Sequence, residues 1–283
     1  MADLSVLILC GRSPRHLYVA NRLCRSARPL AIVQETGKPL TPVAIGKLEP
    51  ARLWHKGWRW LRDRRRYLGD GEAKFFFGDA PPKLDRSDLV FEVPHVDDQR
   101  VVDLAKRLDP DVIAVFGTSL IKGPLLELGR RGIVNLHGGL SPEYRGADCT
   151  FWALYNGEPE KVGCTIHFID AGIDTGKLIA HVSPDVCSDD DELTLFWRAI
   201  KDSAETYAEL FERMASGESF GQHQPGKGRL YQVKDRWLRH ERELDRRLAA
   251  GMLDRVALPK RVTWFVEPSQ CPPVTTELTT RAA

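Results

Sequence analysis

The sequence predicts an α/β fold, built as an open and mostly parallel twisted sheet with helices on both faces. Short apolar runs alternate with segments of helical spacing from residue 5 to residue 137, which is the rhythm of βαβ units. The runs are apolar at nearly every position, as expected for strands buried on both faces. Polar side chains follow the last of these runs at their carboxyl ends, where open sheets bind ligands.

The first half of the chain supplies the expected parallel strands and their connecting helices. Ser5–Cys10 begins the sheet, and the helix that follows starts at Pro14. A later amphipathic helix has Asp97 or Asp98 as its cap, and Pro124 fits the first turn of another helix. The remaining expected elements are strands over 30–34, 89–93, 111–117 and 132–137, and helices over 14–27, 97–108 and 124–129.

The pattern changes in the second half. Two strands are expected over 162–170 and 176–182, joined by the short loop 171–175, and a long helix follows over 191–214. We expect three parts in the chain. They are a catalytic domain over 1–217, a C-terminal appendage over 218–266 with a helical region over 235–253, and a tail over 267–283 that is disordered because its prolines and threonines cannot build a core.

The composition limits the possible functions. The formal net charge of +2 argues against a protein built to bind polyanions. The six cysteines form no CxxC pair, which is typical of reduced, structural thiols in a cytoplasm. There is no signal peptide pattern at the N-terminus, no apolar stretch near the ~20 residues that span a bilayer, and no metal-ligand spacing. We therefore expect a cytoplasmic protein with no metal and no membrane partner.

The candidate site lies between residues 132 and 178. Asn135 and His137 end one strand and project from the same face, because side chains in a strand repeat every second position. Asp174 follows a second strand in a polar loop. An amide donor, an imidazole with a pKa of ~6.5 and a carboxylate are the parts of an acid–base site acting on a carbonyl. An Asp beside the imidazole is expected to raise its pKa and fix its orientation.

Five motifs of this region resemble the formyltransferases that use 10-formyltetrahydrofolate. They are Asn135-Leu136-His137, Pro142-Glu143-Tyr144-Arg145-Gly146, Asn156-Gly157, Gly163-Cys164-Thr165-Ile166-His167 and Gly172-Ile173-Asp174-Thr175-Gly176. The resemblance covers roughly residues 109–179 specifically and extends over 1–217. It implies a Rossmann-type fold and transfer of a formyl group from the folate to an amine. One departure is the pair Gly138-Gly139, where many relatives have Pro-Ser, and it leaves the local shape of the acceptor pocket open.

The resemblance also implies roles for particular residues. Asn135 would donate to the oxyanion, His137 would serve as acid–base partner or oxyanion stabiliser, and Asp174 would hold His137 charged and position a water. The folate is expected to contact Phe116, Thr118, Ser119, Leu120, Ile121, Ile169, Asp170, Ala171 and Ile173. For the apolar members of this set, core packing is an equal alternative. The acceptor is expected to contact Arg12, Ser13, Arg15, Gly138, Gly139, Tyr144 and Arg145, although Arg12 and Arg15 could equally be solvated residues beside a capped helix.

The acceptor is the least defined part of this interpretation. The helical appendage favours an amino sugar, most specifically one linked to a nucleotide, over a tRNA. Alternatives are hydrolysis of the folate by water, or another small amine such as a glycinamide ribonucleotide. The sequence is compatible with a homodimer and leaves the oligomeric state open.

The segment 52–66 holds seven Lys or Arg residues against one Asp, with three tryptophans interleaved. The preferred interpretation is an amphipathic helix with Trp54, Trp58 and Leu61 on its buried face and arginines in solvent. Contact with an anionic acceptor comes second, and nucleic-acid binding comes last. Four histidines without recognisable partners are expected to be structural: His55, His95, His167 and His181.

Overall fold

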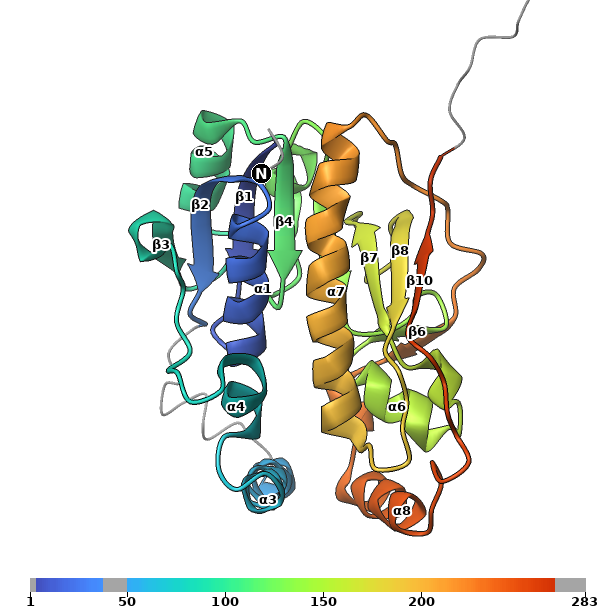
Figure 1. The fold of residues 1–283 in the computed structure, drawn as a ribbon. Coiled ribbons are helices and arrows are strands. Elements are labelled where there is room, and N and C mark those ends of the chain that lie inside the picture. The colour runs from blue at the N-terminus through green and yellow to red at the C-terminus, as the bar shows by residue number, and fades with distance from the viewer. Residues whose placement is uncertain (1–3, 38–49, 268–283) are drawn as a thin grey trace, which may run out of the picture.

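An eight-stranded sheet forms the centre of the protein in this computed structural model, which describes residues 4–37 and 50–267 (Figure 1). The strands lie in the order β10-β8-β7-β5-β4-β1-β2-β3. Five of them are parallel neighbours: β1 (Ser5–Cys10), β2 (Arg28–Glu35), β3 (Val90–Val93), β4 (Val112–Phe116) and β5 (Ile133–His137). This arrangement confirms the predicted fold class.

Three antiparallel strands extend the sheet beyond β5. They are β7 (Cys164–Phe168), β8 (Leu178–Ser183) and β10 (Arg261–Trp264). The first two were predicted, whereas β10 was missed because its residues are mostly exposed and carry no apolar run. A separate two-stranded sheet pairs β6 (Tyr144–Gly146) with β9 (Arg229–Tyr231).

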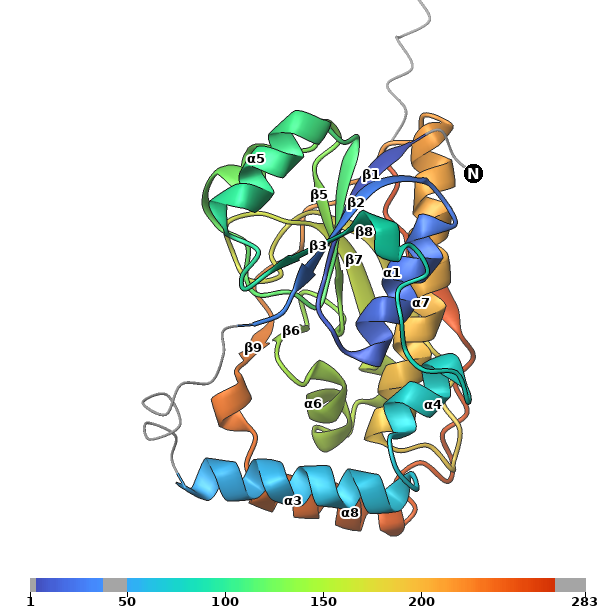
Figure 2. The same ribbon diagram turned by 90° about the vertical axis from the view of Figure 1, so that its left-hand side faces the viewer.

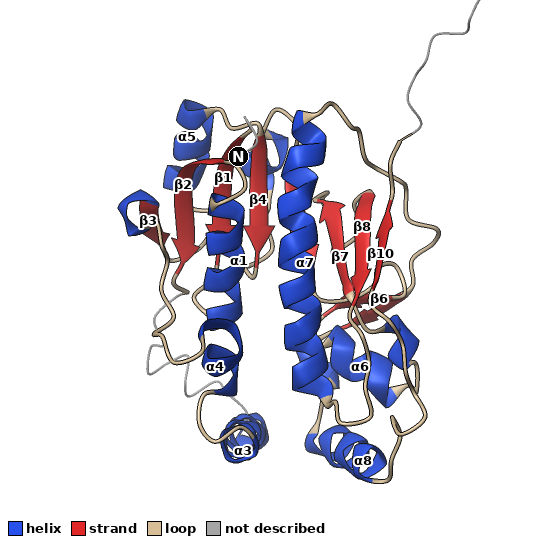
Figure 3. Ribbon diagram, viewed as in Figure 1, coloured by secondary structure: helices blue, strands red, loops and turns tan. Residues whose placement is uncertain are grey.

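Helices cover both faces of the sheet (Figure 3). α1 (Pro14–Cys24) and α7 (Glu192–Ala215) pack on one face, where Leu23, Tyr207 and Phe211 belong to the larger core cluster. α5 (Gln99–Leu108) covers the other face, and its first turn is capped by Asp98, whose side chain accepts the Arg100 N–H. The helix expected from Pro124 is a short 3₁₀ helix over Gly123–Glu127.

Residues 218–266 pack against the main body in addition to forming their own helix. Phe220 belongs to the larger core cluster, and β10 completes the edge of the main sheet. α8 (Leu238–Ala249) sends Leu244 into a third cluster beside α6 (Cys149–Tyr155). The expected disordered tail lies, from residue 268 onward, outside the described residues.

The predicted orientation of the basic helix is wrong. The helix itself, α3 (Pro50–Arg66), is present, and α4 (Gly71–Phe77) follows it. Of the three residues expected on the buried face, Trp54 and Leu61 are 57% and 42% exposed, and Trp58 is only half-buried. Arg62 turns inward instead, to Glu241 of α8 at 2.8 Å. Helical periodicity reveals that two faces exist, but it does not reveal that the acidic partner lies on a helix far along the chain.

Among the described residues, no helix is both long and apolar enough to cross a membrane.

Candidate active site

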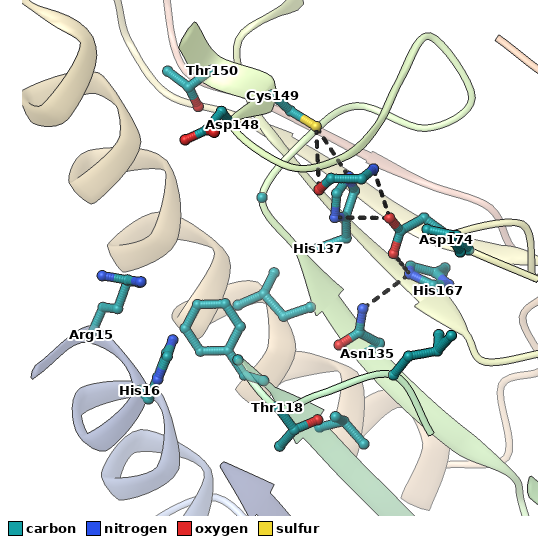
Figure 4. Close-up of a pocket in the computed structure, with 18 of the residues that line it drawn as sticks. Arg15, His16, Thr118, Asn135, His137, Asp148, Cys149, Thr150, His167 and Asp174 are labelled. Carbon is teal, nitrogen blue, oxygen red and sulfur yellow. Dashed lines mark hydrogen bonds and ion pairs between the residues drawn. The ribbon is translucent and has the colours of Figure 1, made fainter. Parts of the chain in front are cut away.

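A pocket of about 520 Å³ opens at the carboxyl ends of β4 and β5 (Figure 4). Its wall is formed by the loop after β4, the end of β5, the loop between β7 and β8, and the starts of α1, α6 and α7. Residues predicted for the site that line this pocket are Arg15, Phe116, Thr118, Ser119, Leu120, Ile121, Asn135, His137, Gly138, Ile169, Asp170, Ile173 and Asp174.

Asn135 and His137 reach the pocket from alternate positions of β5, as their spacing predicted. The two β-sheet neighbours fix their positions. Val115 of β4 pairs in parallel register with Asn135, and His167 of β7 lies directly opposite Asn135 in antiparallel register. Side chains directly opposite each other across two strands are close enough to interact.

Asp174 lies between the two histidines in the loop before β8. Its Oδ2 is 3.4 Å from His137 Nδ1 and accepts the Gly146 N–H at 3.0 Å, while Oδ1 is 3.6 Å from His167 Nε2. The residue has a left-handed φ of 52°, a conformation that needs support from its surroundings. Gln224 supplies it by donating to the carbonyl oxygens of Asp174 and Gly176 at 2.9 and 2.8 Å.

Burial determines the charge state of His137. It lowers the pKa of the imidazole, and the opposing attraction of Asp174 does not restore the ordinary value. Burial also acts to raise the pKa of Asp174, but the two histidines and the Gly146 N–H together lower that pKa to about 2. In the ligand-free pocket, burial of the ring thus opposes the expected role of Asp174 in holding His137 charged. The effect of the Asp174 carboxylate on the imidazole pKa has the expected direction, but the opposing effect of desolvating the ring is larger.

His167 is a site residue that the sequence interpretation missed. Its Nδ1 donates to the Phe168 carbonyl oxygen at 2.8 Å, which leaves Nε2 to accept from Asn135 Nδ2 at 3.2 Å. The sequence led us to expect a structural role for His167, whereas its contact with the Asn135 amide brings it into the pocket wall. The alternation of β7 places it on one face of the strand, but only the register between β5 and β7 brings it opposite Asn135.

Two further pocket residues were also missed. Cys149 Sγ lies 3.6 Å from His137 Nε2, and burial raises the pKa of this thiol well above 9, so the thiol is protonated. His16 at the start of α1 packs edge-on against Phe116, and burial lowers its pKa to about 3. Its Nδ1 has no hydrogen-bond partner within the described part of the chain. A neutral imidazole with a free ring nitrogen therefore lines the pocket.

The loop after β4 is shaped by Gly117 and Glu35. Gly117 has a φ of 72°, and a Cβ there would collide with the His16 ring, so the close approach of α1 requires glycine at this position. Glu35 Oε2 accepts the Ser119 N–H at 2.6 Å, and Oε1 accepts the Val96 N–H at 3.1 Å. One carboxylate thus holds the loop that forms one wall of the pocket.

The remaining predicted acceptor residues lie around the pocket rather than in its wall. Tyr144 is buried with its hydroxyl between Glu158 and Asn156, and Arg145 donates to the Ile173 carbonyl at 3.3 Å. A Cβ on Gly139 would meet Cys149 and the Tyr144 carbonyl. Arg12 lines a second hollow beside β2, and Ser13 precedes α1 without a side-chain cap bond. Of the residues predicted to contact the folate, Ala171 is not among those that line the pocket.

Ion pairs position the charged residues on the α3 side of the pocket. Arg15 pairs with Glu72 at 2.8 Å, and Arg59 of α3 pairs with Glu241 at 3.2 Å. The carboxylates of Asp148 and Glu192 also line the pocket. This end of the pocket therefore offers both anionic and cationic groups, in contrast to the more apolar wall formed by residues 115–121.

Comparison with known proteins finds similarity to formyl transferases over part of the chain. Residues 73–210 match the family model described as formyl transferase. A methionyl-tRNA formyltransferase from Citrifermentans bemidjiense is 38% identical over 119 residues, which are 41% of this chain and 37% of that relative. The chain thus spans about two fifths of the length of the curated relatives it matches.

Solved structures share the fold. A sugar N-formyltransferase from a Shewanella species has a TM-score of 0.52 at 16% identity and covers 85% of this chain and 86% of its own. Glycinamide ribonucleotide transformylase 1 from Symbiobacterium toebii has a TM-score of 0.52 at 20% identity, with coverages of 78% and 93%. At these identities the likeness concerns the fold alone.

Proposed function

We propose that this chain, whose residues 73–210 match the formyl transferase family model, transfers a formyl group from 10-formyltetrahydrofolate to a primary amine. The acceptor that we infer is an amino sugar, most specifically one linked to a nucleotide. The observation that carries the proposal is the convergence of Asn135, His137 and Asp174 on one pocket wide enough for small ligands.

Asn135 is the proposed oxyanion donor. When the amine attacks the formyl carbon, the carbonyl oxygen gains negative charge that needs a positioned N–H donor. One N–H of the Asn135 amide is engaged by His167 Nε2. Because an amide NH₂ carries two hydrogens, the second remains available for the oxyanion. His167 therefore acts as a positioning residue that fixes which way the Asn135 amide points.

His137 is the proposed proton carrier. Its lowered pKa keeps the ring neutral near pH 7, so it can accept the proton that the amine loses after attack. The same ring can then return that proton to the folate nitrogen that leaves. Asp174, with a pKa of about 2, stays ionised and stabilises the imidazolium during this step.

The wall formed by residues 116–121 and 169–173 fits a folate as cosubstrate. It combines Phe116, Ile121 and Ile169 with the polar residues Thr118, Ser119 and Asp170, and this mixture suits a flat heterocycle with donors and acceptors at its edge. Glu35 would orient this wall through the Ser119 N–H without entering the pocket.

Replacing Glu35 with Ala tests that role. Loss of the carboxylate leaves the Ser119 N–H without its partner, which costs on the order of 1–1.5 kcal/mol. We expect the KM for 10-formyltetrahydrofolate to rise about tenfold with little change in kcat, measured by initial rates at saturating acceptor. Glu92→Ala, at an exposed position of β3, is the matched control. A fall in kcat at unchanged KM would contradict the positioning role.

The mixed charges at the α3 end of the pocket support an acceptor that is itself both cationic and anionic. Asp148 and Glu192 suit an amine, while Arg15 and Arg59 suit a phosphate. Residues 218–266 lie behind this end, because Arg236 contacts both Asp148 and Glu192. We propose that 1–217 is the catalytic domain and that 218–266 shapes its acceptor side.

A panel assay tests the function. The protein is incubated with 10-formyltetrahydrofolate and, separately, nucleotide-linked amino sugars, glycinamide ribonucleotide, initiator methionyl-tRNA or no amine. We expect a mass gain of one formyl group on an amino-sugar nucleotide. Transfer only to the tRNA or to the ribonucleotide would overturn the acceptor but keep the chemistry. Formate release with no amine, and no transfer to any acceptor, would identify a hydrolase instead.

A further inference from the structure

Helix α3 is attached to the protein by its charged face. Three side chains of this face point inward. His55 and Arg62 lie 3.4 Å and 2.8 Å from the carboxylate of Glu241, and Arg66 lies 3.0 Å from that of Asp245. An amphipathic helix on a globular protein normally buries its apolar stripe. Here the charged stripe is buried and the apolar one is not.

The outward face of α3 carries an apolar strip, which we define as Leu53, Trp54, Trp60 and Leu61. Their spacing places them on one side of the helix, and their exposed fractions lie between 42% and 61%. Within the described part of the chain, no other segment covers this strip. Large apolar side chains that stay exposed together on one side of a helix mark a surface that meets another molecule.

The charges around the strip have one sign. The exposed ionised side chains of α3 and α8 whose surroundings are described are all basic. Apart from Arg66, which is paired with Asp245, they are Lys56, Arg64, Arg65, Arg239, Arg242 and Arg246. The acidic side chains of both helices are less than a third exposed and are held in ion pairs: Asp63, Glu241, Glu243 and Asp245. The basic surface is therefore the result of acids turned inward and bases turned outward.

The two helices lie at one end of the molecule, beyond the sheet. α3 forms a straight rod there with α8 alongside it (Figures 1 and 2), and the pairs Arg62–Glu241 and Arg66–Asp245 join them. A convex rod with tryptophans and leucines outward and cations beside them can lie flat in the headgroup region of a bilayer. Tryptophan favours that region because its ring is both apolar and polar.

We propose that α3 and α8 form a membrane-contact surface that binds bilayers containing anionic lipids, with the apolar strip inserted at headgroup depth. Charge favours an anionic bilayer over a second copy of the chain, because a second copy would bring two sets of exposed basic side chains face to face. Arg59 of the same helix lines the catalytic pocket, so a bound bilayer would lie close to the acceptor end. The proposal does not depend on the identity of the acceptor.

Cosedimentation with vesicles tests the proposal. The full chain is spun with vesicles of phosphatidylcholine alone or of equal parts phosphatidylcholine and phosphatidylglycerol. We expect binding to the second and not to the first. The double variant Trp54→Ser/Trp60→Ser should lower the affinity at least about tenfold, and Arg64→Gln/Arg65→Gln should lower it about tenfold and weaken its dependence on salt.

Two control variants show whether a loss of vesicle binding is specific to the surface of α3 and α8. Lys106→Gln/Arg107→Gln removes two exposed charges from α5 at the far end of the molecule, and Val262→Ser removes an exposed apolar side chain from β10. Both should bind vesicles like the wild type. All variants are checked by circular dichroism and by formyl transfer measured without vesicles, so a failure of membrane binding is distinguishable from a failure of the proposed activity.

Three outcomes would overturn the proposal. The first is equal vesicle binding by the Trp54→Ser/Trp60→Ser protein. The second is a dimeric mass for the wild type in light scattering together with a monomeric mass for this variant, which would assign the strip to contact with a second copy of the chain. The third is binding to soluble polyglutamate with no binding to either vesicle, which would indicate an acidic protein partner.

Discussion

His137→Ala is expected to lower kcat for formyl transfer by about 10²–10⁴-fold, the usual contribution of a positioned acid–base group. The ring is the only titratable side chain that contacts both Asp174 and the thiol of Cys149 among the described residues. Without it, neither a proton acceptor for the amine nor a donor for the leaving nitrogen remains at this position. Steady-state rates with saturating donor and acceptor measure the effect.

Companion variants separate the proposed roles. Asn135→Ala should cost about 10²–10³ in kcat, as loss of one oxyanion donor does. His167→Gln should have a smaller effect, because its Nε2 only positions the Asn135 amide. His95→Gln, at a partly exposed histidine away from the pocket, is the matched control. Wild-type rates for His137→Ala would remove the proposed mechanism, whatever the other variants do.

The pH dependence follows from the same residue. Because burial lowers the pKa of His137 below its ordinary ~6.5, the neutral base is already present at pH 7. The rate should therefore fall only as the pH drops through that lowered pKa. Asp174→Asn removes the largest of the contributions that raise the pKa of His137. The pH at which the rate falls should therefore move still lower in this variant, and its maximal rate should be reduced. A limb centred above 6.5 in the wild type would contradict a neutral resting His137.

Much of the fold could be predicted from the sequence because its signals are local. The apolar runs of β1, β4 and β5 identify a buried parallel sheet, and strand alternation places Asn135 and His137 on one face. Because open sheets bind ligands at the carboxyl ends of their parallel strands, the correct edge of the sheet could also be predicted. These inferences need only neighbours along the chain.

Features that depend on distant pairing could not be predicted in the same way. His167 reaches Asn135 through the antiparallel register of β7 with β5, which no local pattern encodes. The inward face of α3 depends on Glu241, which is contributed by a helix far along the chain. The protonation state of His137 depends on how completely the fold buries the ring. In each case a long-range contact outweighed the local preference.

Arg236 is expected to be the residue whose loss most destabilises the acceptor side of the protein. Its side chain is 1% exposed, with nitrogen atoms 2.6 Å from Glu192 and 2.7 Å from Glu241. A further nitrogen lies 2.9 Å from Asp148, and the guanidinium stacks 3.8 Å above the centroid of the Phe151 ring. Arg236→Met leaves these carboxylates in a poorly hydrated site without their shared cation. The free energy of unfolding should fall by about 3–5 kcal/mol, as when one partner of a buried pair is removed.

Urea titration measures the loss, with Arg239→Gln at an exposed position of the neighbouring helix α8 as control. The pH dependence of the free energy of unfolding gives a second test of the same charge cluster. Burial acts to raise the pKa of Glu241, but Arg236 and the α3 arginines lower it to about 2. The stability that Glu241 contributes is therefore present above its ordinary pKa near 4.5 and is lost as the pH falls towards 2. In Arg236→Met part of this pKa depression disappears, so the acid-induced loss should be smaller. If the variant unfolds at the wild-type urea concentration, the cluster of charges around Arg236 does not hold α3, α8 and the pocket together.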